Sequence, residues 1–369
     1  MQNNFSFYPT IAITQNNKSV LTPFNEALNL YDKQQYIEAV RAVIKNINAD
    51  AETRYGNKEK TEYAIPHGSV IVNIVITATE VQIYTPFLTI SDAKKIPVLR
   101  QAAQLNFSPL TLAQIQLEDD KLYFNFSCPL HVAEPTKIYD VLKEICINAD
   151  NYDDEFISKF NAAHICQPII HPYSALQKEQ AWNTIQQYIK EAFDWYEKVE
   201  NKRLSALLWD ILVITILKID YYCAPQGALR SEIEKTLIYL NAQNEYYQKL
   251  SAGKEFLKKI QKYDRSTFES NLYAIEVFIP YKIKIDLETI KSNLKNTVEL
   301  AEKEIKKSDY LAAVLSLEYG ILQLFFKYTI DDEVVRLLTN ALQAVSLKPL
   351  QETATELFNT VQKLMTDKL

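Results

Sequence analysis

The sequence predicts an α+β protein: an N-terminal antiparallel sheet with flanking helices, ordered α-β-β-α-β-β-α, followed by an all-α helical bundle. Alternating apolar residues, typical of strands with one buried face, are concentrated between residues 69 and 128. After residue 174, apolar residues recur mostly at helical spacing. We therefore expect an α+β domain at 1–165 and an all-helical domain at 174–369, each large enough to bury its own core.

The first half should supply the strands. Helical spacing at 24–31 and 36–47 predicts either one long helix or a helical hairpin. Pro66 to Gly68 is expected to form a turn before the first strand. We predict strands at 69–77, 81–88, 112–118 and 121–128, with helices at 94–105 and 136–160. One face of this sheet should lie in the core, and the other should be wet or bind a ligand.

The second half should follow a linker at 167–173. The apolar run at 204–219 contains Asp210 and Lys218 and is shorter than the ~20 residues of a membrane span, so we predict a buried core helix. Residues 234–263 form one long helix or two with a break near Gly253, and 268–279 has a helical pattern. A short strand at 281–285, a central helix at 310–328 and terminal helices from Asp331 and at 350–364 complete the bundle.

Composition excludes several classes of function. The content of 47% hydrophobic and 23% charged residues indicates a folded chain, and the net charge of −6 gives no global attraction for nucleic acid or anionic membranes. Five glycines leave no glycine-rich phosphate loop. The N-terminus lacks a signal-peptide pattern, and the unpaired spacing of Cys128, Cys146, Cys166 and Cys223 indicates reduced thiols, so we expect a cytoplasmic protein.

The N-terminal half also carries a family resemblance. The stretch from Leu99 to Asn106 (LRQAAQLN), the stretch from Leu117 to Phe124 (LEDDKLYF) and the closing run 145–160 are similar to the type III secretion chaperone-like family, including its YbjN-like members. The resemblance covers about 24–160. It implies a chaperone-like α+β domain, often dimeric, that binds protein segments and has no catalytic residues. The helical half departs from the short secretion chaperones.

Three residues near the domain junction have side chains that ligate metals. His164, Cys166 and His171 offer imidazole and thiolate donors, which zinc prefers, and they motivate the alternative of a metal-binding protein or an enzyme with a site at the junction. A fourth ligand is missing and the spacing matches no standard pattern. We therefore expect no metal, no cofactor and no enzymatic activity.

Three other groups of polar residues have ordinary structural interpretations. His67 and Ser69 flank Gly68 and resemble a nucleophile with its base, but no orienting acid is identifiable and a turn is expected. Four acidic residues lack the pattern of a calcium loop and should favour the dipole of a helical turn; they are Asp150, Asp153, Asp154 and Glu155. The one basic cluster is expected to be a solvated helix face rather than a nucleic-acid site; it comprises Lys254, Lys258, Lys259, Lys262 and Arg265.

Aromatic residues on the outer sheet face suggest a surface for protein partners. Tyr84 and Tyr123 are expected on this face, where they either bind a partner or pack under the chain's own helices. We predict a non-enzymatic protein-interaction or chaperone-like module with protein partners, possibly a homodimer, and without nucleic-acid or membrane binding. A structural part of a larger assembly is a further alternative.

Overall fold

A computed structural model describes residues 5–12 and 24–366, and the chain divides into two compact units. The helical unit comprises Met1–Ile13, Pro172–Tyr273 and Lys282–Leu369, and the α+β unit comprises Thr14–His171 and Ala274–Tyr281. The change of unit after His171 falls within the expected linker. Two short segments depart from a division into continuous domains at 1–165 and 174–369, because the N-terminus belongs to the helical unit and Ala274–Tyr281 belongs to the α+β unit.

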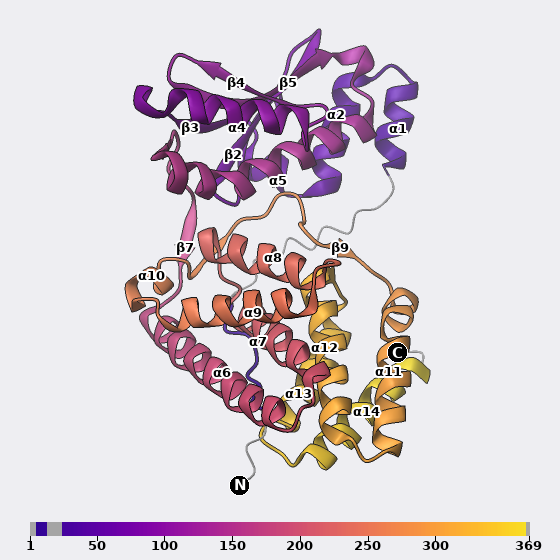
Figure 1. Ribbon diagram of the computed structural model, residues 1–369. Helices are drawn as coiled ribbons and strands as arrows, with labels where there is room; N and C mark the ends of the chain where they lie inside the picture. The colour runs from indigo at the N-terminus through magenta and orange to yellow at the C-terminus, as the bar shows by residue number, and fades with distance from the viewer. Residues whose placement is uncertain (1–4, 13–23, 367–369) are drawn as a thin grey trace. The chain divides into compact units, whose positions relative to one another are not determined.

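The α+β unit consists of helices followed by an antiparallel sheet into which further helices are inserted (Figure 1). Its elements are α1 (Asn25–Asp32), α2 (Tyr36–Ile47), α3 (Ala51–Tyr55), β1 (Glu62–His67), β2 (Val70–Ile76), β3 (Glu80–Thr89), η1 (Asp92–Lys94), α4 (Lys95–Phe107), β4 (Gln114–Glu118), β5 (Lys121–Pro129), η2 (Leu130–Val132), α5 (Pro135–Phe160) and β6 (Ala163–His164). The strand order is β1-β2-β3-β5-β4, and β6 also pairs with β3. The fold class predicted from the sequence is therefore confirmed.

One face of this sheet forms the core. Val72 and Ile74 of β2, Ile83 of β3 and Phe124 of β5 are fully buried and share a cluster with residues of α2, α4 and α5. The register pairs Ile74 with Ile83 and Ile83 with the half-buried Phe126, so the core-facing positions of neighbouring strands lie in one row. Alternate residues point to the opposite face, where they are half-buried or exposed.

Strand β1 was not predicted. Pro66 and His67, expected in a turn, are its last residues, and the turn itself is made by Gly68 with a φ of 58°. Strand β1 lies at the edge of the sheet, where a proline without an N–H group is tolerated. The ambiguity at 24–47 is resolved as two separate helices, α1 and α2, that pack together.

The helical unit is a bundle of α-helices (Figure 1). They are α6 (Ala175–Asn201), α7 (Leu208–Cys223) after the short η3 (Ser205–Leu207), α8 (Gly227–Asn241), α9 (Tyr246–Gln261), α10 (Arg265–Glu269), α11 (Leu287–Lys306), α12 (Tyr310–Lys327), α13 (Asp332–Ala344) and α14 (Leu350–Thr366). Two short sheets pair β7 (Ile170–Pro172) with β8 (Tyr273–Ile275), and β9 (Ile283–Lys284) with β10 (Tyr328–Thr329).

Helices α7 and α12 form the centre of this bundle, as their apolar sequences predict. Most residues of both helices are buried, and the two helices pack against each other. Within the described residues, α12 is also the one helix that is long and apolar enough to cross a membrane, although 56% of that stretch is buried inside the protein. Burial of this kind is typical of the core helix of a bundle.

Two expectations for the helical half are wrong. The break in 234–263 lies between α8 and α9, at 242–245, whereas Gly253 lies inside α9, where a Cβ atom would come within 3.2 Å of Leu212. The helix expected at 268–279 ends at Glu269, and the chain continues in an extended form. The apolar residues of this stretch are buried although the backbone is extended, because Phe278 and Ile279 join the core of the α+β unit.

Candidate functional site

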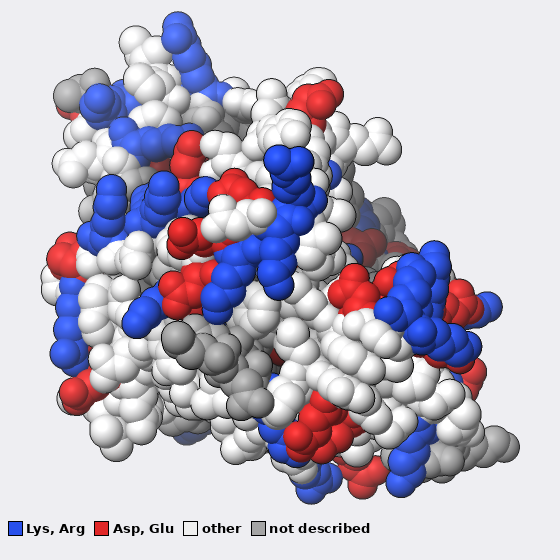
Figure 2. All heavy atoms as spheres, turned by 60° about the horizontal axis from the view of Figure 1, so that its bottom comes forward, with Lys and Arg blue, Asp and Glu red and all other residues white. Residues whose placement is uncertain are grey.

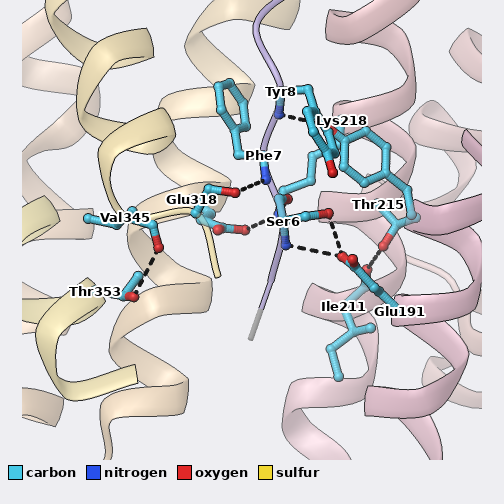
Figure 3. A network of polar contacts seen from close by, with 12 residues as sticks. Ser6, Phe7, Tyr8, Glu191, Ile211, Thr215, Lys218, Glu318, Val345 and Thr353 are labelled. Carbon is cyan, nitrogen blue, oxygen red and sulfur yellow. Dashed lines mark hydrogen bonds and ion pairs between the residues drawn. The ribbon is translucent and has the colours of Figure 1, made fainter. Parts of the chain in front are cut away.

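The helical unit encloses an extended segment of its own chain, residues 5–12 (Figure 3). The segment runs between α6 and α7 on one side and α12 and the turn after α13 on the other. Ser6 is 0% exposed and Phe7 is 3% exposed, so the segment is internal at these positions. We call the space that holds residues 5–8 the segment channel. The residues that contact the segment there include Gln187, Tyr188, Glu191, Trp195, Lys218, Tyr221, Tyr222, Ser346 and Leu347.

Charged side chains of the channel bind both polar groups of the Ser6 backbone. The Ser6 amide donates to Glu191 Oε2 at 3.1 Å, and the Ser6 hydroxyl donates to the same oxygen at 2.7 Å. Lys218 Nζ donates to the Ser6 carbonyl at 3.1 Å and pairs with Glu318 Oε2 at 2.7 Å. Lys218 and Glu318 are 4% and 3% exposed, so this ion pair lies in the core of the bundle. A buried charge pair stays favourable when further hydrogen bonds satisfy it, and Ser6 supplies one of them.

The neighbouring backbone groups are satisfied by uncharged partners. The Phe7 amide donates to Ser346 Oγ at 2.9 Å, and the Tyr8 amide donates to the Tyr188 hydroxyl at 2.9 Å. Burial raises the pKa of Tyr188 well above its ordinary value, so this phenol stays protonated at any physiological pH. Further along, the Ile11 amide donates to the Tyr222 carbonyl at 2.9 Å, and Gln177 Nε2 donates to the Ile11 carbonyl at 3.0 Å. Buried backbone groups of an extended segment require such partners.

Aromatic rings hold the side chains of the segment. Phe5 stacks on Trp195 with ring centroids 4.9 Å apart, and Lys218 Nζ lies 5.3 Å from the Phe5 ring. Phe7 stacks on Tyr221 at 5.5 Å. Tyr8 packs against two tyrosine rings of α6 and α7. The arrangement binds the backbone of the segment and its aromatic side chains.

Sequence reasoning missed this site because the N-terminus was examined only as a possible export signal. A signal was nevertheless present: Lys218 and Glu318 each lie in the middle of a strongly apolar helix. A charge at such a position needs a buried partner. Pairing the two residues would have placed α7 beside α12, although it would not have shown that Ser6 lies between α6 and this pair.

The α+β unit also holds an extended segment, Ala274–Tyr281, which comes from the second half of the chain. The Gly68 amide donates to the Glu276 carbonyl at 2.8 Å. His67 Nδ1 accepts the amide hydrogens of Phe278 and Ile279 at 3.1 and 3.3 Å. Because Nδ1 accepts two hydrogen bonds, this nitrogen carries no proton here. Each unit is therefore completed by an extended segment from a distant part of the sequence.

Two groups of residues that the sequence suggested separately lie at one place in the α+β unit. The Ser69 amide donates to Asp150 Oδ1 at 2.6 Å, and the Ser69 hydroxyl also donates to Asp153. The Ser69 hydroxyl thus bonds carboxylates, in contrast to a nucleophilic serine, which donates to an imidazole. Desolvation raises the pKa of Asp153 to about 8 and that of Asp154 to about 6. The four acidic residues lie in the C-terminal half of α5, so the expectation that they favour the dipole of a helical turn is wrong. Asp150 and Asp153 instead hold the β1–β2 turn.

The side chains proposed as metal ligands are not brought together. His164 lies in β6 with Nε2 3.8 Å from Asp153 Oδ2, Cys166 is half-buried in the following loop and His171 is exposed in β7. Across residues 5–12 and 24–366, no group of three His, Cys, Asp or Glu side chains is placed to hold a metal ion. Burial lowers the pKa of His164.

Members of the basic cluster are engaged with neighbouring side chains. Lys259 pairs with Glu232 at 2.7 Å, and Lys254 Nζ lies 4.1 Å from the Tyr196 ring. Arg265 pairs with Glu269. On the face shown in Figure 2, basic and acidic side chains are interspersed. Paired charges of this kind are typical of a solvated helix surface.

Tyr84 and Tyr123 lie on the outer face of the sheet, as expected. Both are half-buried, and the register places Tyr84 opposite Asn73 and Tyr123 opposite Pro86. The face therefore mixes aromatic, apolar and amide side chains.

No protein-family model matches the chain, and no curated protein matches its sequence significantly.

Proposed function

We propose that this protein is a non-enzymatic protein-interaction module, and that its helical unit binds extended protein segments in the segment channel. The observation that carries the proposal is the complete burial of Ser6, whose amide and carbonyl are bonded by Glu191 and Lys218. Side chains that satisfy the main chain of an extended segment are what a peptide receptor needs, because main-chain bonds hold any sequence and pockets add specificity.

We call residues 5–12 the resident segment, and in this proposal they act as a ligand supplied by the chain itself. A ligand on the same chain has an effective concentration on the order of mM, so it outcompetes free peptide of equal affinity. The resemblance of residues 24–160 to secretion chaperone-like domains supports the same class of function for the α+β unit. We extend the proposal to a cytoplasmic location. We also propose that the chain self-associates through its own extended segments.

The test opens the channel in the full-length chain. Ser6→Trp places a large ring where no space exists, so the resident segment is expelled while every channel residue is kept. We expect this variant to bind a labelled peptide with the sequence of residues 1–12 at least tenfold more tightly than the wild-type chain does, measured by fluorescence anisotropy. Pro9→Trp is the matched control, since Pro9 is exposed in the same segment and the resident segment should stay bound.

A second variant, Phe7→Asp, expels the segment by placing a charge at a buried aromatic position. Folded Ser6→Trp and Phe7→Asp chains that both fail to bind the peptide would contradict a receptor function. Loss of helical circular dichroism in both variants would show that residues 5–12 are a structural part of the bundle, and the proposal would fail in that case too.

A further inference from the structure

We infer that the segment channel is a binding site for one ordered water molecule, which bonds Lys218, Glu191 and Thr215 and supports the hold of the channel on Ser6. This water belongs to the channel whether or not the channel accepts segments of other proteins. A cavity beside the segment, the hydrogen-bonding groups around the cavity and the charges of these groups all point to water.

The cavity has the size of a single water site. Its volume is about 10 Å³, and Phe5 borders it together with residues of α6, α7 and α12. A water molecule needs at least about 10–15 Å³ of space for its centre and two to four polar partners. The polar residues of the lining are Tyr188, Glu191, Thr215 and Lys218, and the remainder is apolar. The cavity therefore suits one water molecule and nothing larger.

Lys218 has a hydrogen to donate beyond the bonds that it already makes. An ammonium group carries three hydrogens. Lys218 donates to the Ser6 carbonyl at 3.1 Å, and its pair with Glu318 Oε2 at 2.7 Å uses a second hydrogen. The Phe5 ring lies 5.3 Å from Nζ and attracts the charge, but it offers no oxygen or nitrogen. Because Lys218 is buried, its third hydrogen needs an acceptor such as a water oxygen.

Glu191 and Thr215 offer the acceptors that this water needs. The Glu191 carboxylate accepts three described hydrogen bonds, two from Ser6 and one from Gln187, whereas a carboxylate has about four acceptor sites. Thr215 Oγ donates to a carbonyl of its own helix at 2.7 Å, so its oxygen can still accept. Figure 3 shows Glu191, Thr215 and Lys218 on α6 and α7, beside Ser6. A water that accepts from Lys218 and donates to the other two makes three hydrogen bonds, which is typical of buried water.

The charges around the cavity exclude ions. A cation would lie against the Lys218 ammonium, and an anion would lie against the Glu191 carboxylate. Like charges repel strongly in a buried site. An apolar occupant would leave the third hydrogen of Lys218 without an acceptor. The occupant is therefore a neutral molecule that both donates and accepts hydrogen bonds.

The water supports both charged groups that hold Ser6. Glu191 accepts from the Ser6 amide and hydroxyl, and Lys218 donates to the Ser6 carbonyl. A water bonded to both side chains keeps the carboxylate and the ammonium in the positions from which they bind the segment. Bonds through a bridging water are nearly as favourable as direct ones. Loss of the water should therefore loosen Ser6.

A high-resolution crystal structure of the full-length protein tests the presence of the water. We expect density for one water within about 2.7–3.2 Å of Lys218 Nζ, Thr215 Oγ and a carboxylate oxygen of Glu191. Thr215→Val keeps the shape of the side chain but removes the acceptor, so this density should be lost. Thr355→Val is the matched control and should retain the water, because Thr355 makes the same bond to its own helix at 2.8 Å but is exposed.

Hydrogen exchange of the Ser6 amide, measured by mass spectrometry on the same chains, tests the role of the water. We expect Thr215→Val to raise the exchange rate about fivefold, as the loss of one net hydrogen bond would. Thr355→Val should leave the rate within about twofold of the wild type, as is usual for an exposed position.

Each contrary result overturns a stated part of the inference. A wild-type cavity without density, or with the density of chloride or a metal ion, overturns the water itself, and this measurement needs no variant to fold. Water that persists in Thr215→Val overturns the assigned partners. A Thr215→Val chain that has lost the water but keeps the wild-type exchange of Ser6 overturns the role of the water in holding the segment.

Discussion

Lys218 has three roles in the core of the helical unit, because it bonds the Ser6 carbonyl, pairs with Glu318 and lies over the Phe5 ring. Lys218→Met keeps the length of the side chain but leaves the Glu318 carboxylate buried without its cation. Removing one partner of a buried pair typically costs about 3–5 kcal/mol of unfolding free energy. We expect a loss of this size in urea denaturation of the full-length chain.

The matched control for this substitution is Lys190→Met, which removes an exposed lysine of α6 and should change stability by less than about 0.5 kcal/mol. The double variant Lys218→Met with Glu318→Leu should recover most of the loss, since apolar residues of similar size often replace a buried pair without cost. If Lys218→Met is as stable as the wild type, the ion pair contributes nothing to the stability of the helical unit.

The raised pKa of Asp153 leads to a prediction of how the stability of the α+β unit depends on pH. Its pKa is about 8 in the folded protein, because burial disfavours the charged form, whereas an exposed aspartate titrates near about 3.9. Between these values the folded state binds more protons than the unfolded state, so stability falls as pH rises. We expect the unfolding free energy to fall on the order of 3 kcal/mol between about pH 5 and about pH 8, measured by urea denaturation.

Asp153→Asn identifies the group responsible. The amide cannot ionise, so the variant should lose much less stability than the wild type over the same pH range. Asp154, whose pKa is about 6, and His164, whose pKa is lowered by burial, then contribute with opposite signs. Asp140→Asn, at an exposed position of the same helix, should leave the wild-type pH dependence unchanged. A wild-type stability that is flat or rises over this pH range would show that the Asp153 carboxyl is not held in a desolvated site.

At the scale of single elements, the sequence predicted those strands and helices that a local pattern of apolar residues is enough to determine. Strands β2, β3 and β5 alternate between a buried and an open face, and this periodicity of two marks a strand whatever surrounds it. Helices α7 and α12 were predicted because long apolar runs without glycine-rich breaks form core helices. Strand β1 was missed because its proline is compatible with a strand only at a sheet edge, and edge position is a property of the whole sheet.

The two extended segments could not be predicted from local pattern at all. Residues 5–12 and Ala274–Tyr281 have no strand periodicity, and their backbone groups bond mainly to residues more than 150 positions away. The second segment even has apolar residues at helical spacing, and the contacts of Phe278 and Ile279 with the sheet unit override that preference. Long-range bonding of this kind is visible only in the folded chain.

At the scale of the whole molecule, the candidate site follows from the way the chain alternates between its units. The sequence predicted two continuous domains. It gave no sign that Lys218, which pairs with Glu318, also bonds Ser6 more than 200 residues away at the N-terminus. Each half of the chain gives up a short extended segment to the other unit. A fragment cut at the linker should therefore lack part of its own core.

This exchange of segments makes a direct prediction for the fragment 24–171. It lacks Phe278 and Ile279, which are 1% and 0% exposed in the α+β unit, and burial of such side chains contributes about 1.5–3 kcal/mol each. We expect the fragment to unfold at lower temperature than the α+β unit of the full-length chain, and a peptide of residues 272–283 to raise its melting temperature. The same peptide with Phe278→Asp and Ile279→Asp should have no effect, because charges cannot replace the buried rings and methyl groups. A fragment as stable alone as in the full-length chain would show that Ala274–Tyr281 is not part of the core.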